Sequence, residues 1–172
     1  RFAVTRLMDD ADLLEVGADR TALLVNGVGS IGDSGNRKRI FDQWRSVGYE
    51  FTNVIHPSAI ISRLAWLGSG VQVFAGAVIQ ADAVLEDNVL INTGALVDHD
   101  CRIGAHTHIA PGAVLSGSVS LGACCHIGVG ARIIQGLQIG AEVLVGAGAV
   151  VISDIPFHHK ALGVPARAVS RN

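Results

Sequence analysis

An aliphatic residue recurs at every sixth position, without interruption, from Val54 to Ile155. The second position of each hexad is Ile, Leu or Val, and the sixth is mostly Ala, Val or Cys, with Thr107 as the polar exception. Neither the period of a helix nor the alternation of a strand requires this spacing. A coil of three short strands does, because each strand then points one aliphatic side chain into a narrow triangular interior. The sequence therefore predicts a mainly β fold, a parallel β-helix of hexapeptide repeats, over residues 54–155.

Composition supports this interpretation and excludes some partners. All aromatic residues lie outside residues 75–156, as expected of an interior too narrow for a ring, and lysine occurs only as Lys38 and Lys160. A net charge of −2 favours neither nucleic acid nor a membrane surface as a partner. The hydrophobic fraction of 49% and mean hydropathy of +0.43 are high, yet no apolar run approaches the ~20 residues of a membrane span. We assign the apolar excess to a core and a subunit interface.

The number of cysteines and the N-terminal sequence bear on the cellular location of the protein. Cys101, Cys124 and Cys125 are odd in number, which argues against a disulfide framework. Cys101 and Cys125 occupy sixth positions of hexads, so they are expected to be small buried hydrophobes rather than nucleophiles. No signal peptide is visible, and the predicted location is the cytoplasm.

Residues 1–53 and 156–172 differ from the repeats. Residues 1–53 predict part of an α/β, Rossmann-like domain, with a strand, a helix and a second strand at Thr21–Asn26, Asn36–Val47 and Tyr49–Ile55. The helix would bury Ile40, Trp44 and Val47. The strand-like start at Arg1 predicts that further residues precede it. Pro156 ends the hexads, and residues 156–172 are expected to form a C-terminal tail.

The segment Gly27–Gly32 matches the G-x-G-x-x-G pattern of dinucleotide-binding domains. In those domains the glycines run directly into the helix, whereas residues 33–35 intervene here. A single strand–helix–strand unit is also too small to hold a dinucleotide. We expect this segment to be a loop, either an ordinary one or one that faces a nucleotide sugar.

Polar residues are rare inside the repeats, and most of them gather in one stretch. With three hexads per coil, residues 18 apart stack about 4.8 Å from each other, so His108 should stack on His126. The stretch contains Asn92, Asp98, His99, Asp100, His106 and His108. An imidazole beside carboxylates is a plausible general base, because the carboxylate orients it and stabilises its protonated form. Solvated corner residues are the alternative interpretation.

Metal binding is a further alternative. Four histidines could supply zinc ligands, including across a subunit interface, but their spacing matches no specific zinc pattern: His99, His106, His108 and His126. We therefore expect no metal, and keep a trimeric zinc hydratase on the same fold and a non-catalytic assembly β-helix as rival functions.

The hexads together with the run Ile91–Cys101 resemble the sugar O-acyltransferases of the sialic-acid O-acetyltransferase type. That family includes N-acetyltransferases acting on nucleotide-linked 4-amino sugars in bacterial glycan pathways. The resemblance extends over Met8–Asp10, Ile55–Ala59 and the tail Gly163–Arg167. Its most specific part is an Asn followed seven residues later by a His and an acid, with a second His nine residues further on.

The resemblance implies roles for individual residues. His99 would be the general base, Asp100 the acid that orients it, where relatives can have Glu, and Asn92 a polar group beside the acceptor. The residues expected at acetyl-CoA are His108 near the thioester, the backbones of Gly117, Val129 and Ala147 along the pantetheine, and Gly163 and Arg167 near the nucleotide end. Asp9 and Asp10 resemble an acidic pair that binds the sugar nucleotide, although the glycine-rich first loop of that domain has no counterpart here.

The resemblance also implies left-handed coils, where the general crossover rule favours right-handed ones, and a homotrimer with active sites between subunits. The predicted activity is transfer of acetyl from acetyl-CoA to an amino or hydroxyl group of a sugar, preferentially a nucleotide-linked 4-amino sugar for a bacterial surface glycan. No covalent intermediate is required, and backbone N–H groups near Gly117 are expected to steady the oxyanion.

Overall fold

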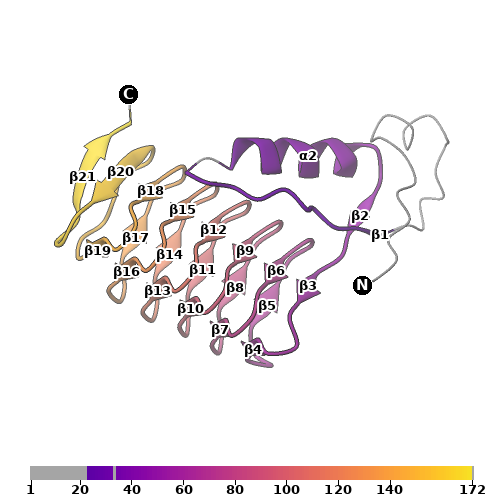
Figure 1. Cartoon of the computed structure of the whole chain (residues 1–172), viewed down its shortest axis with the longest axis horizontal. Helices are drawn as coiled ribbons and strands as arrows, with labels where there is room; N and C mark the ends of the chain where they lie inside the picture. The colour runs from indigo at the N-terminus through magenta and orange to yellow at the C-terminus, as the bar shows by residue number, and fades with distance from the viewer. Residues whose placement is uncertain (1–22, 33, 172) are drawn as a thin grey trace.

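The computed structural model describes residues 23–32 and 34–171, so Asp9 and Asp10 lie outside the described residues. The repeats form a parallel β-solenoid with three faces (Figure 1). The six-stranded face contains β4 (Ile60–Ile61), β7 (Val78–Ile79), β10 (Leu96–Val97), β13 (Val114–Leu115), β16 (Arg132–Ile133) and β19 (Val150–Val151). The five-stranded face contains β5 (Trp66–Leu67), β8 (Val84–Leu85), β11 (Arg102–Ile103), β14 (Ser120–Leu121) and β17 (Gln138–Ile139). The predicted parallel β-helix is confirmed.

The eight-stranded face is the longest. Its strands within the hexads are β3 (Val54–Ile55), β6 (Gln72–Val73), β9 (Leu90–Ile91), β12 (His108–Ile109), β15 (His126–Ile127) and β18 (Leu144–Val145). Beyond Pro156 the tail adds β20 (His159–Leu162), parallel to β18, and β21 (Arg167–Ser170), antiparallel to β20. The tail therefore extends this face instead of leaving the solenoid.

The hexad register is confirmed by burial. The second-position aliphatics are buried from Val73 to Val151, whereas Ile55 in the first coil is 47% exposed because no coil precedes it. Thr107, the polar sixth-position residue, is fully buried, and its Oγ donates to the Gly122 carbonyl at 3.0 Å and accepts from the Cys125 N–H at 3.0 Å. These bonds offset the cost of burying the hydroxyl.

The N-terminal part contains β1 (Leu23–Leu24), α2 (Gly35–Ser46) and β2 (Glu50–Phe51), with β1 and β2 parallel. The predicted helix is confirmed to within one residue at each end. Its predicted buried face is wrong in part: the buried residues are Arg37, Phe41 and Trp44, while Val47 is 39% exposed. The face is rotated because Phe41 stacks on Phe51.

Helix α2 lies along one corner of the solenoid, where the five-stranded face turns into the eight-stranded face (Figure 1). Successive coils place a residue with positive φ at this corner: Gly70, Asn88, His106 and Cys124. The rings of Phe41 and His106 meet edge to face with centroids 5.6 Å apart, and a Cβ at Gly70 would lie 2.9 Å from Phe41 Cε2. Glycine at 70 therefore permits the close approach of the helix.

Before α2, residues 25–32 run as a strap across the eight-stranded face (Figure 1). Asn26 contacts Gln72 in β6, Ser30 contacts His108 in β12, and Gly32 lies against Leu144 in β18. The strap thus crosses successive coils in order. No helix among the described residues has the length and apolarity needed to cross a membrane.

Candidate active site

The corner between the six-stranded and five-stranded faces carries His99, in the turn from β10 to β11. Its side chain is 58% exposed, and Nδ1 lies 2.7 Å from Asp100 Oδ2. The backbone N–H of His99 donates to Asp98 Oδ1 at 2.8 Å. Asp100 has a φ of 60°, the conformation that this turn also has in neighbouring coils at Asp82 and Ser118. The predicted pairing of His99 with Asp100 is confirmed.

This arrangement suits a general base. The hydrogen bond to Asp100, and then the charge of Asp98, raise the pKa of His99 above its usual value. When His99 is neutral, Nδ1–H donates to Asp100, so Nε2 keeps a lone pair. Gly117 lies directly against the ring: a Cβ there would be 2.5 Å from His99 Cε1 and 2.7 Å from Nε2. Position 117 must therefore be glycine for the imidazole to lie as it does.

A second group of residues surrounds a cavity of about 630 Å³ between the strap and the eight-stranded face. Its polar wall contains Asn92, His108 and His126, and Val129 lies on its apolar wall. The strap closes one side through Gly27–Ile31. A cavity of this size, mostly apolar with a few convergent polar groups, has the character of a small-molecule site.

His108 is the most constrained side chain of the cavity. Its Nδ1 lies 2.9 Å from the Ser30 carbonyl oxygen and 3.1 Å from Ser30 Oγ, and its Nε2 lies 3.2 Å from Asn92 Nδ2. Burial, and then the neighbouring His126, lower the pKa of His108 to about 4. His108 is therefore neutral at physiological pH.

His126 lies one coil further along, as predicted from the spacing. β12 pairs with β15 so that His108 is opposite His126, and the two rings meet edge to face with centroids 4.9 Å apart. Burial lowers the pKa of His126, and its Nδ1 has no hydrogen-bond partner within the described part of the chain. The cavity thus contains two neutral imidazoles.

The structure separates residues that the sequence placed together. Asn92 follows β9, at the corner between the eight-stranded and six-stranded faces, so it belongs with His108 and not with His99. Ala147 is exposed and stacks one coil beyond Val129, whose carbonyl accepts from the Gly148 N–H at 2.8 Å. Gly163 and Arg167 lie at the hairpin between β20 and β21.

Other candidates from the sequence have structural roles. His106 faces α2, where its Nδ1 lies 2.9 Å from Asn88 Nδ2, and burial lowers its pKa. Burial raises the pKa of Cys101 and Cys125 to about 11, so both thiols stay protonated at neutral pH. Among residues 23–32 and 34–171, no three His, Cys, Asp or Glu side chains come close enough together to hold a metal ion.

Sequence reasoning did not assign a role to Ser30 or Gln72. Both belong to the site, because Ser30 contacts His108 and both residues line the cavity. The glycine-rich pattern around Ser30 was the available signal, since a backbone that approaches another element closely favours glycine. The pattern does not show which face the loop would cover.

A family model described as bacterial transferase hexapeptide (six repeats) matches residues 82–117. A comparison with curated protein sequences gave no match. Among solved structures, PerB from Caulobacter crescentus in complex with CoA and GDP-perosamine is 48% identical, with 81% of this chain and 68% of that chain covered and a TM-score of 0.79.

Two further structures are similar. The acetyltransferase domain of PglB from Neisseria gonorrhoeae is 38% identical, with 92% of this chain and 77% of that chain covered and a TM-score of 0.85. This domain has also been solved in complex with acetyl coenzyme A. WeeI from Acinetobacter baumannii is 28% identical, with 81% and 68% covered and a TM-score of 0.77.

Proposed function

The chain belongs to the hexapeptide-repeat sugar acyltransferases, with acetyl-CoA as its co-substrate, and from this premise we propose that it acetylates an amino group of a nucleotide-linked 4-amino sugar. The observation that carries the proposal is the His99–Asp100 pair, exposed at a corner with its Nε2 lone pair free over Gly117. The similarity to a structure containing GDP-perosamine supports a nucleotide sugar as acceptor. A hydroxyl acceptor is the second choice, because it needs proton removal throughout the transition state.

The chemistry follows from this geometry. The sugar nitrogen attacks the thioester carbonyl, His99 Nε2 takes the proton that the nitrogen loses, and Asp100 stabilises the imidazolium. The new C–N bond forms first and gives a tetrahedral oxyanion; its collapse breaks the C–S bond, and the proton held by His99 is available to the departing thiolate. No covalent enzyme intermediate is needed. Backbone N–H groups near Gly117 are proposed to stabilise the oxyanion.

The separation of the two groups supports a shared site. His99 lies at the corner between the six-stranded and five-stranded faces of the solenoid. His108 and the cavity lie on the eight-stranded face, and Asn92 lies at its edge. We propose a homotrimer of left-handed solenoids in which the His99 corner of one subunit approaches the cavity of its neighbour. The exposed apolar residues Phe74, Val129 and Ile134 are consistent with burial in such an assembly.

The remaining residues are assigned by the family resemblance. Ala147 and Val129 would follow the pantetheine arm, and Gly163 and Arg167 would meet the nucleotide end of the coenzyme. Asp9 and Asp10 would contact the sugar nucleotide in a Rossmann-like domain. The proposed setting is synthesis of a bacterial surface glycan in the cytoplasm, where acetyl-CoA is made.

Subunit complementation tests the shared site. His99→Ala and His108→Gln proteins should each be nearly inactive, but co-expressed subunits should form mixed trimers that regain activity, because some interfaces then combine an intact His99 with an intact cavity. A mass near that of one 17.9 kDa chain in light scattering, or no recovery in verified mixed trimers, would exclude the shared site.

The acceptor is tested by measuring coenzyme A release with GDP-perosamine, with other nucleotide-linked 4-amino sugars, and with their 4-hydroxy counterparts. We expect turnover only with the amino sugars. Turnover confined to the hydroxy sugars would reverse the choice of acceptor, and absence of acetyl-CoA binding in calorimetry would overturn the proposal.

A further inference from the structure

The strap over the cavity is fixed at both ends by arginine side chains that donate to its carbonyl groups. Arg37 Nη1, from α2, donates to the Asn26 carbonyl at 3.0 Å and to the Val28 carbonyl at 2.8 Å. Arg171, after β21, donates to the Gly32 carbonyl at 3.3 Å. Ser30 lies between these anchors, so its position depends on them.

Arg37 is an unusual residue to find in this place. It is 1% exposed, and among the described residues its Nε and Nη2 have no hydrogen-bond partner and its guanidinium forms no ion pair. Burial lowers its pKa to about 10. A buried cation without a counter-charge destabilises a fold relative to an apolar side chain of similar volume. Stability therefore does not explain Arg37, and its contacts with the strap are the remaining explanation.

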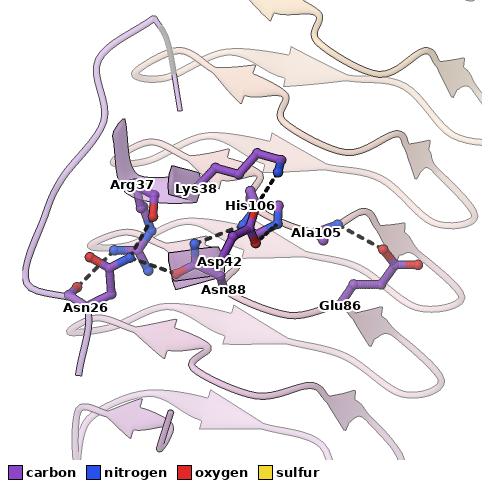
Figure 2. A network of polar contacts seen from close by, with 8 residues as sticks. All are labelled: Asn26, Arg37, Lys38, Asp42, Glu86, Asn88, Ala105 and His106. Atoms are coloured by element: carbon purple, nitrogen blue, oxygen red, sulfur yellow. Dashed lines mark hydrogen bonds and ion pairs between the residues drawn. The ribbon is translucent and has the colours of Figure 1, made fainter. Parts of the chain in front are cut away.

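Asn26, the second residue of the strap, ties this anchor to the solenoid. Its Nδ2 donates to the Arg37 carbonyl at 2.9 Å and lies 3.3 Å from Asn88 Oδ1 (Figure 2). Its carbonyl accepts from Gln72 Nε2 at 2.7 Å in addition to Arg37. The strap is thus joined to both α2 and the eight-stranded face immediately before the cavity.

The hydrogen bonds around His108 admit one tautomer. The Ser30 carbonyl can only accept, so His108 Nδ1 must carry the proton. Asn92 Oδ1 accepts from the Thr93 N–H at 2.8 Å, which orients the Asn92 amide so that Nδ2 donates to His108 Nε2. The contacts at Nδ1 and at Nε2 therefore require the same tautomer, with a proton at Nδ1 and a lone pair at Nε2.

We propose that Arg37 is a positioning residue: by holding the strap it keeps the Ser30 carbonyl on His108 Nδ1 and so presents His108 Nε2 to the cavity as a hydrogen-bond acceptor. An acceptor cannot bond to the oxygen of a thioester, but it can orient an N–H group, such as a pantetheine amide or an amino group of the sugar, that takes the place of the Asn92 Nδ2 donor on Nε2. The proposed tautomer of His108 does not depend on the proposed function. The expected effect of Arg37 on kcat/KM does rest on the proposed function.

The tautomer is measured first, on the wild-type protein without ligand. In ¹⁵N NMR of histidine-labelled protein, with the His108 signals assigned by their loss in His108→Gln, Nδ1 should be of the protonated type and Nε2 of the unprotonated type. A protonated Nε2 would overturn the proposal whether or not the protein proves to be an acetyltransferase. The expected tautomer without any acetyl transfer would remove the proposed function alone.

The role of Arg37 is tested by Arg37→Met, with Arg39→Met as the matched control. Arg39 lies on the same helix but is exposed and bonds only to Gln43 and Asn36 side chains. Arg37→Met should show both His108 tautomers and a fall in kcat/KM on the order of 10–100-fold, as expected when a reacting group is displaced by about 1 Å. Arg39→Met should match the wild type in both.

A folded Arg37→Met protein with one His108 tautomer and wild-type kcat/KM would overturn the role. If Arg37→Met does not fold, Arg37→Gln keeps a polar side chain but removes the guanidinium that donates to the Asn26 and Val28 carbonyls, and its NMR spectrum decides instead. Mixed tautomers in Arg37→Gln are expected, and an unchanged single tautomer would contradict the proposal.

Discussion

The corner that carries His99 and the cavity that carries His108 each contain a histidine, but the two imidazoles lie in opposite environments. His99 is exposed beside two carboxylates, which raise its pKa, whereas His108 is buried beside a second imidazole and its pKa falls to about 4. One ring can gain and lose a proton near neutral pH, and the other stays neutral. The difference shows that the environment, not the residue type, raises the pKa of one imidazole and lowers the pKa of the other.

The origin of the difference lies in the coil. His99 is in a turn, where side chains point to solvent, while His108 is on a strand that the strap covers. The same repeat therefore provides two kinds of site, and only the covered one needs residues from outside the solenoid. The following predictions test this contrast.

The largest expected effect is on turnover. His99→Ala should lower kcat by roughly 10²–10⁴-fold, because the base is lost, while acetyl-CoA affinity measured by calorimetry stays nearly unchanged. His56→Ala is the control, since His56 is also an exposed histidine of a solenoid turn, bonded to Ser58. If His99→Ala retains wild-type kcat on every acceptor, the His99 corner is not the catalytic half.

The next effect concerns the core on which both regions rest. Ile103→Ala should lower the free energy of unfolding by roughly 2–5 kcal/mol, because Ile103 is 1% exposed in the solenoid interior. Ile60→Ala is the control, because Ile60 is also a strand residue but is 66% exposed. Urea denaturation measures both, and an equal loss in the two variants would contradict the assigned register.

A smaller effect is the loss of stability in acid. The pKa of His108 is about 4 when folded and about 6.5 when unfolded, so the unfolded chain binds more protons between these values. Stability should therefore fall as the pH drops from about 6.5 to about 4, by an amount on the order of 1–3 kcal/mol. The lowered pKa values of His106 and His126 act in the same direction.

His108→Gln isolates the contribution of this residue. Denaturation at pH 7 and at pH 4.5 should show a smaller difference for the variant than for the wild type. An unchanged difference would mean that His108 is not held neutral by its burial, and the contrast with His99 would disappear.

The smallest effect is a shift in the pH profile. Asp100→Asn removes the hydrogen-bonded carboxylate that raises the pKa of His99, so the acidic limb of kcat/KM should move to lower pH. Asp82→Asn is the control, because Asp82 occupies the equivalent turn one coil earlier and also has a positive φ. If the pH profile moves equally in both variants, the acidic limb does not report the protonation of His99.

Much of the fold could be predicted because the hexad period is local. Residues 18 apart must stack if the coils are equal, so the buried aliphatics and the pairing of His108 with His126 followed from counting. The His99–Asp100 contact was also predictable, since the two residues are neighbours and the turn brings them together. The buried face of α2 was not, because the apolar residues alone did not indicate that Arg37 would be buried.

The sequence by itself determined the solenoid, its register and the exposed acid–base pair, because all three depend on contacts repeated at a fixed short interval. Only the tertiary structure decided that Asn92 belongs with His108, that the strap covers the cavity and that Arg37 holds it. The contacts of Asn26 with Gln72 and of Ser30 with His108 join residues 46 and 78 positions apart. They follow no period, and they form because a strap laid across several coils meets whichever side chains those coils present.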